Sequence, residues 1–380
     1  MRSLFTESPS YSDGASQSWP RAERLVRDRP RIKFCEGAII AAVVADLHLD
    51  LLLELSWRRH ESPNGDVFTR TWLPLLEAGG VGLQICPIYV GIDRQPEGAL
   101  REALRQAAAF HAAVREQPDR VIAVRGRNDL DALERGGSLG LLLALEGVEP
   151  FGYDPGTADV FVELGLRMAS LTWNRRNAFA DGAAEDPTGG LSRLGRELVQ
   201  HLASLGVVLD LAHASAATFR DVLEAAGEAP LLVSHAACRA LVDHPRNLDD
   251  DQLQELAQRD GLLGVMLQPF VIDPERPTID RVIDHLEHAA AMMGVEHVAL
   301  GGDFTARLAT VLPPEPPRDD LLLPPGMGLE AAIEGLAGPE DYPALEVALR
   351  RRGWSEPDVA AVLSGNALRF LRAALLRSGS

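Results

Sequence analysis

Residues of the kinds that bind metal ions follow apolar stretches at several places in this 380-residue chain. The first apolar run, residues 39–45, leads into Asp46-Leu47-His48-Leu49-Asp50. Side chains at positions i and i+2 of an extended segment point to the same side, so His48 and Asp50 can present an imidazole and a carboxylate to one point. Four more apolar runs end at Glu146, His213, His235 and Asp303. One such residue means little, but the repeated series of His, Asp and Glu indicates a metal centre.

These residue types suit a pair of zinc ions. Imidazole nitrogen and carboxylate oxygen both bind Zn²⁺ well, and two ions about 3.5–4 Å apart need a bridging carboxylate and a bridging water. Glu146 is the natural bridge, because it comes between the His48–Asp50 pair and the two later histidines. One ion would be held by His48, Asp50 and Glu146. The other would be held by Glu146, His213 and His235. Asp303 would face the bridging water as a general base, with a second role as a weak ligand as the alternative left open.

Strand-like and helix-like segments alternate along the chain and must position these residues. Eight short apolar segments have the character of strands buried on both faces; they are residues 39–47, 81–89, 139–146, 166–172, 206–212, 230–235, 261–267 and 297–303. Helical spacing appears between them in three sets: Leu100, Leu104, Ala108 and His111; Leu194, Leu198, His201, Leu202 and Leu205; and Val282, Leu286, Ala289 and Met293.

This order predicts an α/β protein with a (β/α)8 TIM barrel and extra helices at the C-terminus, between Tyr342 and Arg377. A doubly wound open sheet is the alternative. The carboxyl ends of all strands of a barrel meet at one mouth, whereas in an open sheet the residues after the first and eighth strands would lie far apart. The candidate ligands follow predicted strands 1, 3, 5, 6 and 8, which favours the barrel.

The prediction divides the chain into two parts. Residues 1–30 are expected to form a flexible N-terminal arm, and residues 31–380 a single barrel domain. A proline-rich segment, 312–328, follows the eighth strand and should lie over the mouth, either as a lid or as a passive surface loop.

Composition and charge limit the partners. The formal net charge of −18 argues against nucleic acid and anionic membranes, which attract basic surfaces, and fits a small-molecule substrate. No apolar stretch reaches the length of about 18 residues that spans a bilayer, and residues 1–30 lack the apolar core of a secretory signal. The three cysteines form no C-x-x-C pair, as expected of free thiols in a reducing compartment. We therefore predict a cytoplasmic protein.

The motifs, in their order and spacing from about Ala45 to Leu371, resemble those of the membrane dipeptidases, also called renal dipeptidases, within the amidohydrolase-like hydrolases. The matching segments are Asp46-Leu47-His48-Leu49-Asp50, Leu145-Glu146-Gly147, Leu171-Thr172 with Asn177 and Ala180-Asp181, Asp210-Leu211-Ala212-His213-Ala214-Ser215, Ser234-His235, His244-Pro245-Arg246-Asn247, Gly301-Gly302-Asp303-Phe304 and Gly365-Asn366-Ala367-Leu368-Arg369.

The resemblance implies a dipeptidase with two Zn²⁺ ions on a TIM barrel. It implies the same five metal ligands, with Glu146 shared between the ions, and Asp303 as the group that handles the proton. Arg246 would hold the substrate carboxylate, and Asn177 and Trp173 would lie at the substrate. Family members often accept a D-residue at the C-terminal position and often form homodimers. Asp210, inside a strand, is expected to support a ligand rather than bind metal.

Two departures from the family pattern bear on the substrate. Trp173 stands where the well-studied members carry a histidine, and an indole can donate one hydrogen bond but cannot become an imidazolium. The usual Asp-Phe-Asp-Gly reads Asp303-Phe304-Thr305-Ala306. An alternative is therefore an amidohydrolase of the same fold that acts on a cyclic amide, a β-lactam-like ring or a natural-product intermediate. A non-catalytic binding protein is a further alternative, which the complete set of metal-site residues disfavours.

The sequence leads to a mechanistic hypothesis. A dipeptide binds with its carboxylate on the Arg246 guanidinium, whose fork suits a carboxylate. A hydroxide that bridges the two zinc ions attacks the scissile carbonyl. Asp303 takes the proton and passes it to the leaving amine, and the Trp173 indole N–H helps to stabilise the oxyanion.

Overall fold

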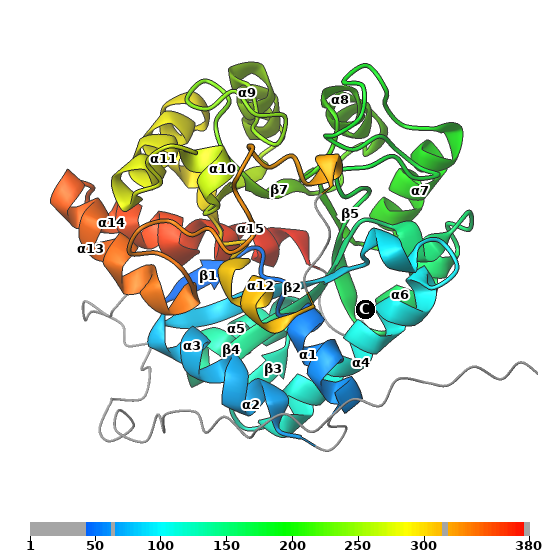
Figure 1. Cartoon of the computed structure of the whole chain (residues 1–380), viewed down its shortest axis with the longest axis horizontal. Coiled ribbons are helices and arrows are strands. Elements are labelled where there is room, and N and C mark those ends of the chain that lie inside the picture. Colours follow the sequence, from blue (N-terminus) through cyan, green and yellow to red (C-terminus); the bar gives the residue numbers. More distant parts are fainter. Residues whose placement is uncertain (1–42, 62–64, 314–317, 376–380) are drawn as a thin grey trace, which may run out of the picture. The chain divides into compact units, whose positions relative to one another are not determined.

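The computed structural model describes residues 43–61, 65–313 and 318–375. Within them, eight parallel strands close into a barrel in the order β1, β2, β4, β5, β6, β7, β8, β9, with β9 paired back to β1 (Figure 1). The strands are β1 Val44–Asp46, β2 Val81–Tyr89, β4 Leu139–Glu146, β5 Leu166–Ser170, β6 Val208–Asp210, β7 Leu231–Ala236, β8 Leu262–Met266 and β9 Val298–Gly301. The predicted TIM barrel is confirmed.

A ninth strand was not predicted. β3, Val121–Ala123, pairs with residues 139–141 at the start of β4 and lies outside the closed ring. Three apolar residues between two helices are too short a run to stand out by periodicity. The first predicted strand began at residue 39, and residues 39–42 lie outside the described part of the chain.

Helices surround the strands (Figure 1). The α-helices are α1 Leu51–Glu61, α2 Val67–Thr71, α3 Leu73–Ala78, α4 Ala99–Glu116, α5 Arg127–Gly136, α6 Thr157–Glu163, α7 Arg193–Ser204, α8 Ala216–Ala225, α9 Asp250–Gln258, α10 Pro269–Ile272, α11 Ile279–Met293, α12 Ala306–Val311, α13 Tyr342–Arg352, α14 Glu356–Ala360 and α15 Asn366–Ala374. Short 3-10 helices occupy Ile92–Arg94, Glu149–Phe151, Val295–His297, Asp319–Leu321 and Pro339–Asp341, and Ala361–Gly365 is a π-turn.

The buried face that the helical spacing predicts is correct for α11 and wrong for α4. Val282, Leu286, Ala289 and Met293 of α11 are all buried. In α4, however, Leu100 and Leu104 are 44% and 42% exposed, and the buried face is lined instead by alanines and Phe110. An alanine-rich face can pack closely on a barrel, so the large apolar residues did not mark the buried side.

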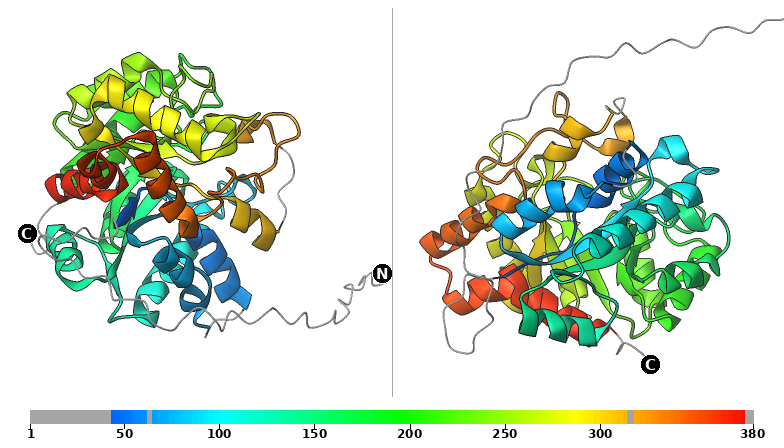
Figure 2. Two further views of the ribbon diagram at one scale, coloured as in Figure 1. Left: turned by 90° about the vertical axis from the view of Figure 1, so that its left-hand side faces the viewer. Right: turned by 90° about the horizontal axis from the view of Figure 1, so that it is seen from below.

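Of the C-terminal helices α13, α14 and α15, the last covers the end of the barrel opposite its carboxyl mouth. Side chains of α15, among them Phe370 and Leu371, pack with the residues that fill the barrel interior. The Asn366 side-chain amide donates to the backbone oxygens of Val295 and Val298, just before and at the start of β9. Figure 2 shows these helices, orange to red, beside the strands. The predicted extra C-terminal helices are confirmed, and the carboxyl ends of the strands stay open for a site.

Several expectations stay predictions from the sequence. The described residues belong to one compact unit, but the expected arm, 1–30, lies outside them, and the boundary at residue 31 is untested. Cys86 and Cys238 are buried free thiols. No helix in the described part of the chain has both the length and the apolar character of a membrane-spanning segment. The cytoplasmic location and a homodimer also stay predictions.

A buried carboxylate ties α1 to α12, the helices that follow β1 and β9. Glu54 is fully buried; its carboxylate accepts from Nε and Nη2 of Arg307, both at 2.8 Å, and from Nε of Arg58 at 2.6 Å. We expect Glu54→Ala to lower the free energy of unfolding by about 1.5–3 kcal/mol, because it removes charged hydrogen bonds between the two helices, while the guanidinium groups, each about a third exposed, keep contact with water. Urea unfolding measures this loss. The solvent-facing Arg105–Glu102 pair is the control: Glu102→Ala should cost less than about 1 kcal/mol. A similar cost for both variants would contradict the assignment.

Candidate metal centre

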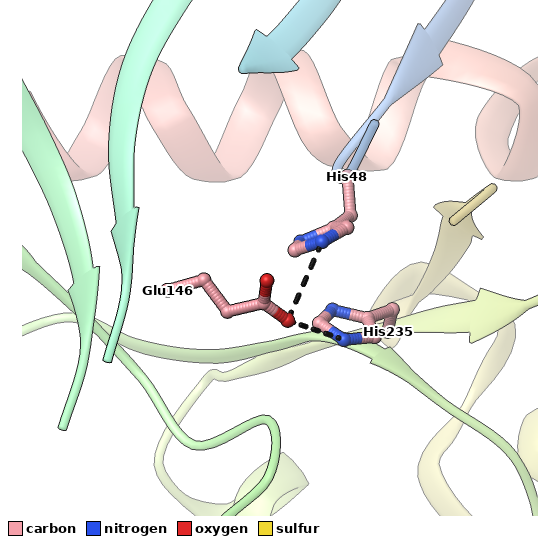
Figure 3. Close-up of side chains that lie close together, drawn as sticks. All are labelled: His48, Glu146 and His235. Carbon is pink, nitrogen blue, oxygen red and sulfur yellow. Dashed lines mark ion pairs between the residues drawn. The ribbon is translucent and has the colours of Figure 1, made fainter. Parts of the chain in front are cut away.

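The five predicted ligands and Asp303 gather at the carboxyl mouth of the barrel. Nε2 of His48 lies 3.6 Å from Oε1 of Glu146, 3.8 Å from Asp50 and 3.9 Å from Asp303. Within the described chain, two groups of three have ligand atoms within 4.8 Å of one another: His48, Glu146 and His235, and His48, Asp50 and Asp303. Figure 3 shows the first group, with the Glu146 carboxylate between the two imidazoles. His48 belongs to both groups, and neither group repeats a predicted ligand set in full, because His48 lies close to His235 as well as to Asp50.

His213 completes the second predicted ligand set. Its Nε2 lies 2.7 Å from Oε1 of Glu146 and 2.8 Å from Nε2 of His235, and that of His235 lies 3.5 Å from the same Glu146 oxygen. Backbone geometry contributes to this placement. His213 has φ of 64° and Asp303 has φ of 49°, in the left-handed region that side chains other than glycine rarely adopt. Such strain is common at functional sites, where surrounding contacts hold it in place.

Hydrogen bonds at the far ring nitrogens fix the tautomers of the two later histidines. The Asn174 amide donates through Nδ2 to the backbone oxygen of Asp320, so its Oδ1 accepts from Nδ1 of His213 at 2.6 Å. Ser234 donates its hydroxyl to Asp210, so its oxygen accepts from Nδ1 of His235 at 2.8 Å. Both neutral rings therefore turn a lone pair at Nε2 toward Glu146.

This arrangement fits a cation. Two imidazole lone pairs and a carboxylate oxygen converge on one small space. Burial first, and then the charges of Arg246 and His48, lower the pKa of His213 and His235 well below the usual value, so both imidazoles stay neutral and present lone pairs. Among the described residues, Nε2 of His48 and Oδ1 of Asp50 are buried without a hydrogen-bond partner. Buried polar atoms without partners are costly, and a metal ion at the cluster would satisfy both of these atoms.

The charges around His48 favour a positive charge at the same place. Burial lowers the pKa of His48, but the neighbouring Glu146, Asp50 and Asp303 carboxylates outweigh it and raise the pKa to about 10. Burial also raises the pKa of Glu146 well above its usual value and that of Asp303 to about 7. Three carboxylates in a buried space need a cation, and divalent metal ions supply more positive charge than a single proton.

Asn174 was missed by the sequence analysis. It lies between His213 and the loop at Asp320, and we expect Asn174→Ala to lower metal affinity about 10–100-fold by releasing the ring of His213. Asn174→Asp keeps an oxygen for Nδ1 of His213 and loses only the bond to Asp320, so it should retain the affinity. Titration of metal-free protein with zinc measures both. If both variants lose the same zinc affinity, the loss comes from the broken bond to the loop at Asp320 and not from the release of the His213 ring.

Asp46 is a second missed residue. Its Oδ1 accepts from the backbone nitrogens of His48 at 3.1 Å and Gly302 at 2.7 Å, so it holds together the ends of β1 and β9. Asp46 lies two residues before His48, on the same face of the extended segment. The period of two that paired His48 with Asp50 could therefore have found it.

Arg246 reaches this centre from the loop after β7. It is 3% exposed, and its Nη2 donates to the backbone oxygen of His235 at 3.1 Å. Burial lowers its pKa to about 10, while Asp303, Glu146 and Asp210 oppose the shift, so it stays charged at neutral pH. A buried guanidinium beside a metal centre can bind a carboxylate.

Trp173 lies beside the cluster, whereas Asn177 serves its own loop. The indole ring lies 5.8 Å from the His213 ring and 5.5 Å from Tyr89, with the Arg318 guanidinium 5.6 Å from its centroid. The Asn177 amide donates to Glu149 and to the Leu171 backbone oxygen, and its oxygen accepts from two backbone nitrogens, those of Phe179 and Ala180. Both polar atoms of its side chain already form hydrogen bonds, which indicates a structural role in the loop.

Of the predicted proline-rich loop, 312–328, residues 312–313 and 318–328 are described, and the latter part contacts the loops of the mouth. Besides Asn174, Arg175 forms an ion pair with the buried Asp320, and Nε2 of His244 lies 2.9 Å from the backbone oxygen of Leu322. Together with Arg318 above Trp173, these contacts place the segment beside the metal cluster. Residues 314–317 lie outside the described chain.

Comparison with known proteins gives consistent results. The membrane dipeptidase family (peptidase family M19) matches residues 36–312. Dipeptidase aclJ of Aspergillus oryzae is 30% identical over 328 residues, covering 83% of this chain and 72% of that protein. The solved dipeptidase AC, of the same peptidase family, is 25% identical with a TM-score of 0.74, covering 88% of this chain and 99% of its own. A Rhodobacter sphaeroides metallopeptidase, solved with a phosphinate mimic of L-Ala-D-Ala, shares the fold at 24% identity and a TM-score of 0.74, with the same coverage.

Proposed function

Because the chain belongs to the membrane dipeptidase family, peptidase family M19, and is therefore a metal-dependent enzyme that hydrolyses dipeptides, we propose that it works with two zinc ions at the cluster described above. His48, Asp50 and Glu146 would hold one ion, and Glu146, His213 and His235 the other. The observation that carries this proposal is the convergence of the His213 and His235 lone pairs on Glu146. When bound, such ions supply an acidified water as nucleophile and withdraw electrons from the scissile carbonyl.

The protein's own residues would orient the substrate and move its protons. Arg246 would bind the C-terminal carboxylate and set the distance between that end and the cluster. Asp303, 3.9 Å from His48, would accept a proton from the attacking water and pass it to the leaving amine. The Trp173 indole, beside the His213 ring, would direct its N–H toward the oxygen of the scissile carbonyl as negative charge develops there.

We also propose that the substrates include L-Xaa-D-Xaa dipeptides. This follows the family resemblance and the L-Ala-D-Ala mimic named for the Rhodobacter structure. Trp173 motivates a second candidate class, the cyclic amides, because no imidazolium can form at that position.

A panel of L-Xaa-L-Xaa, L-Xaa-D-Xaa and ring-amide substrates tests these proposals with zinc-loaded protein. Hydrolysis of L-Xaa-D-Xaa dipeptides at rates similar to or above those of the L,L forms is the expected result. If protein that holds two zinc ions per chain hydrolyses ring amides but no dipeptide, its substrates are cyclic amides, the second candidate class.

The carboxylate role of Arg246 makes a separate prediction. Arg246→Ala should raise KM about 10–150-fold with a smaller change in kcat, since hydrogen bonds to charged groups contribute about 1.5–3 kcal/mol. Ala-Ala and its C-terminal amide form the matched pair: the parent should prefer the acid, and the variant should lose that preference. An unchanged kcat/KM for Ala-Ala would contradict the assignment.

A further inference from the structure

Thr305, two residues beyond Asp303, stands where the family pattern has an aspartate. It is the N-cap residue of α12, where a threonine hydroxyl usually accepts a hydrogen bond from the first turn of the helix, but here it forms no such bond. It donates instead to the backbone oxygen of Leu329 at 2.7 Å and accepts from Nε2 of Gln268 at 3.0 Å. The hydroxyl therefore joins two other loops rather than capping its own helix.

Gln268 extends this chain of hydrogen bonds to Asp303. It is buried at the N-cap of α10, and its Nε2 donates both to Oγ1 of Thr305 and to the backbone oxygen of Asp303. The last acceptor fixes the order of the donors. The Leu329 backbone oxygen can only accept, so the Thr305 hydroxyl uses its one hydrogen there and must accept from Gln268. The Gln268 amide is thereby held with its nitrogen, and not its oxygen, toward Asp303.

The backbone of Asp303 is held on both sides as a result. Its N–H donates to the backbone oxygen of His48 at 2.9 Å, and its own backbone oxygen accepts from Gln268. Between these two bonds the residue has φ of 49°, a conformation that is uncommon for residues other than glycine and that surrounding contacts must maintain. The backbone conformation sets where the Asp303 carboxylate points, so these bonds help to aim it.

We propose that Thr305 is a positioning residue for the reaction: through Gln268 it holds the backbone of Asp303 in the conformation that directs the carboxylate at the attacking water. The inference rests on the proposed function, in which Asp303 is the base. An ionised aspartate at position 305 could accept from Gln268, but it has no hydrogen to donate to Leu329. The threonine hydroxyl does both, so in this chain the base is tied to the segment that directly follows the proline-rich loop.

Thr305→Val removes the hydroxyl and preserves the shape of the side chain. It should lower kcat about 10–100-fold and change KM less than about 2-fold, because a base displaced by about 1 Å loses rate on that scale while the substrate contacts remain. Thr305→Ser keeps a hydroxyl that donates and accepts, and it should retain at least about half of the parent kcat. Zinc content should be equal in all variants.

A second readout does not depend on turnover. In metal-free protein the bond to His48 protects the Asp303 amide hydrogen, and Thr305→Val should speed its exchange with deuterium at least about 10-fold, measured in a peptide that covers the loop after β9. Thr310→Val is the matched control, because the exposed Thr310 hydroxyl donates to the Arg307 backbone oxygen within α12 itself. The control should change neither the exchange rate nor kcat.

A double-mutant cycle tests the route through Gln268. Gln268→Met removes the amide donors with little change in volume, and adding Thr305→Val to it should lower kcat less than about 2-fold further. Parent-like kcat in Thr305→Val, or losses of the same size in Thr305→Val and Thr305→Ser, would overturn the positioning role. Full activity of Asp303→Asn would instead count against the proposed function, and the exchange rate at Asp303 would still show whether Thr305 holds the loop.

Discussion

Asp303→Asn is expected to lower kcat about 10²–10⁴-fold, the usual contribution of a positioned general base. The substitution preserves shape and removes the proton acceptor. Asparagine tolerates the left-handed backbone that Asp303 adopts at φ of 49°, so the loop after β9 should keep its conformation. Zinc content should be unchanged, because the five proposed ligands remain. Steady-state kinetics with metal analysis on the same sample measure both quantities.

The chain offers a matched control for the backbone. Asp260, before β8, has nearly the same φ of 51°, and its side chain is 78% exposed. Asp260→Asn makes the same chemical change in the same backbone conformation away from the cluster, and it should leave kcat unchanged. Full activity of Asp303→Asn would remove Asp303 as the base, and loss of zinc in that variant would make it a ligand instead.

Glu146→Gln should abolish hydrolysis and reduce bound zinc from two ions to fewer than one per chain. Oε1 of Glu146 lies 2.7 Å from Nε2 of His213 and 3.5 Å from Nε2 of His235, and the variant replaces the carboxylate with a neutral amide that cannot bridge two cations. Burial raises the pKa of Glu146, so its ionised form costs stability in the metal-free protein at neutral pH. The metal-free variant should therefore be at least as stable as the metal-free parent.

Glu149→Gln is the control for this prediction. Glu149 is a second acidic residue, in the 3-10 helix just after β4; its carboxylate accepts from the Asn177 amide, and burial raises its pKa to about 7. Its neutral replacement should retain zinc and activity. Metal retention and turnover in Glu146→Gln, or equal losses in the two variants, would contradict the bridging role.

The hydrophobic periodicity of the segments and their order along the chain were sufficient to predict the barrel. The strands are short, apolar and buried on both faces, and the ligands follow them at their carboxyl ends, so identifying the strands also located the cluster. β3 was not predicted because a run of three residues is too short to show the periodicity of a strand. The buried face of α4 was misread because it packs through alanines, while Leu100 and Leu104 face solvent.

What the sequence could not supply depends on contacts between distant loops. Asn174 and Ser234 acquire their roles only when folding places them at Nδ1 of His213 and His235. Asn177 was assigned to the substrate from its motif, and the structure shows its amide committed to its own loop. The left-handed backbone at His213 and Asp303 likewise has no signature in a single sequence.

Zinc-dependent recovery of dipeptide hydrolysis tests the central claim most directly. The protein would be stripped with a chelator and titrated with zinc, while L-Ala-D-Ala hydrolysis and bound metal are followed together. The two-ion site predicts full activity once two zinc ions are bound per chain, and none in Glu146→Gln at the same zinc concentration. Full activity with one bound ion, or in the metal-free protein, would contradict it.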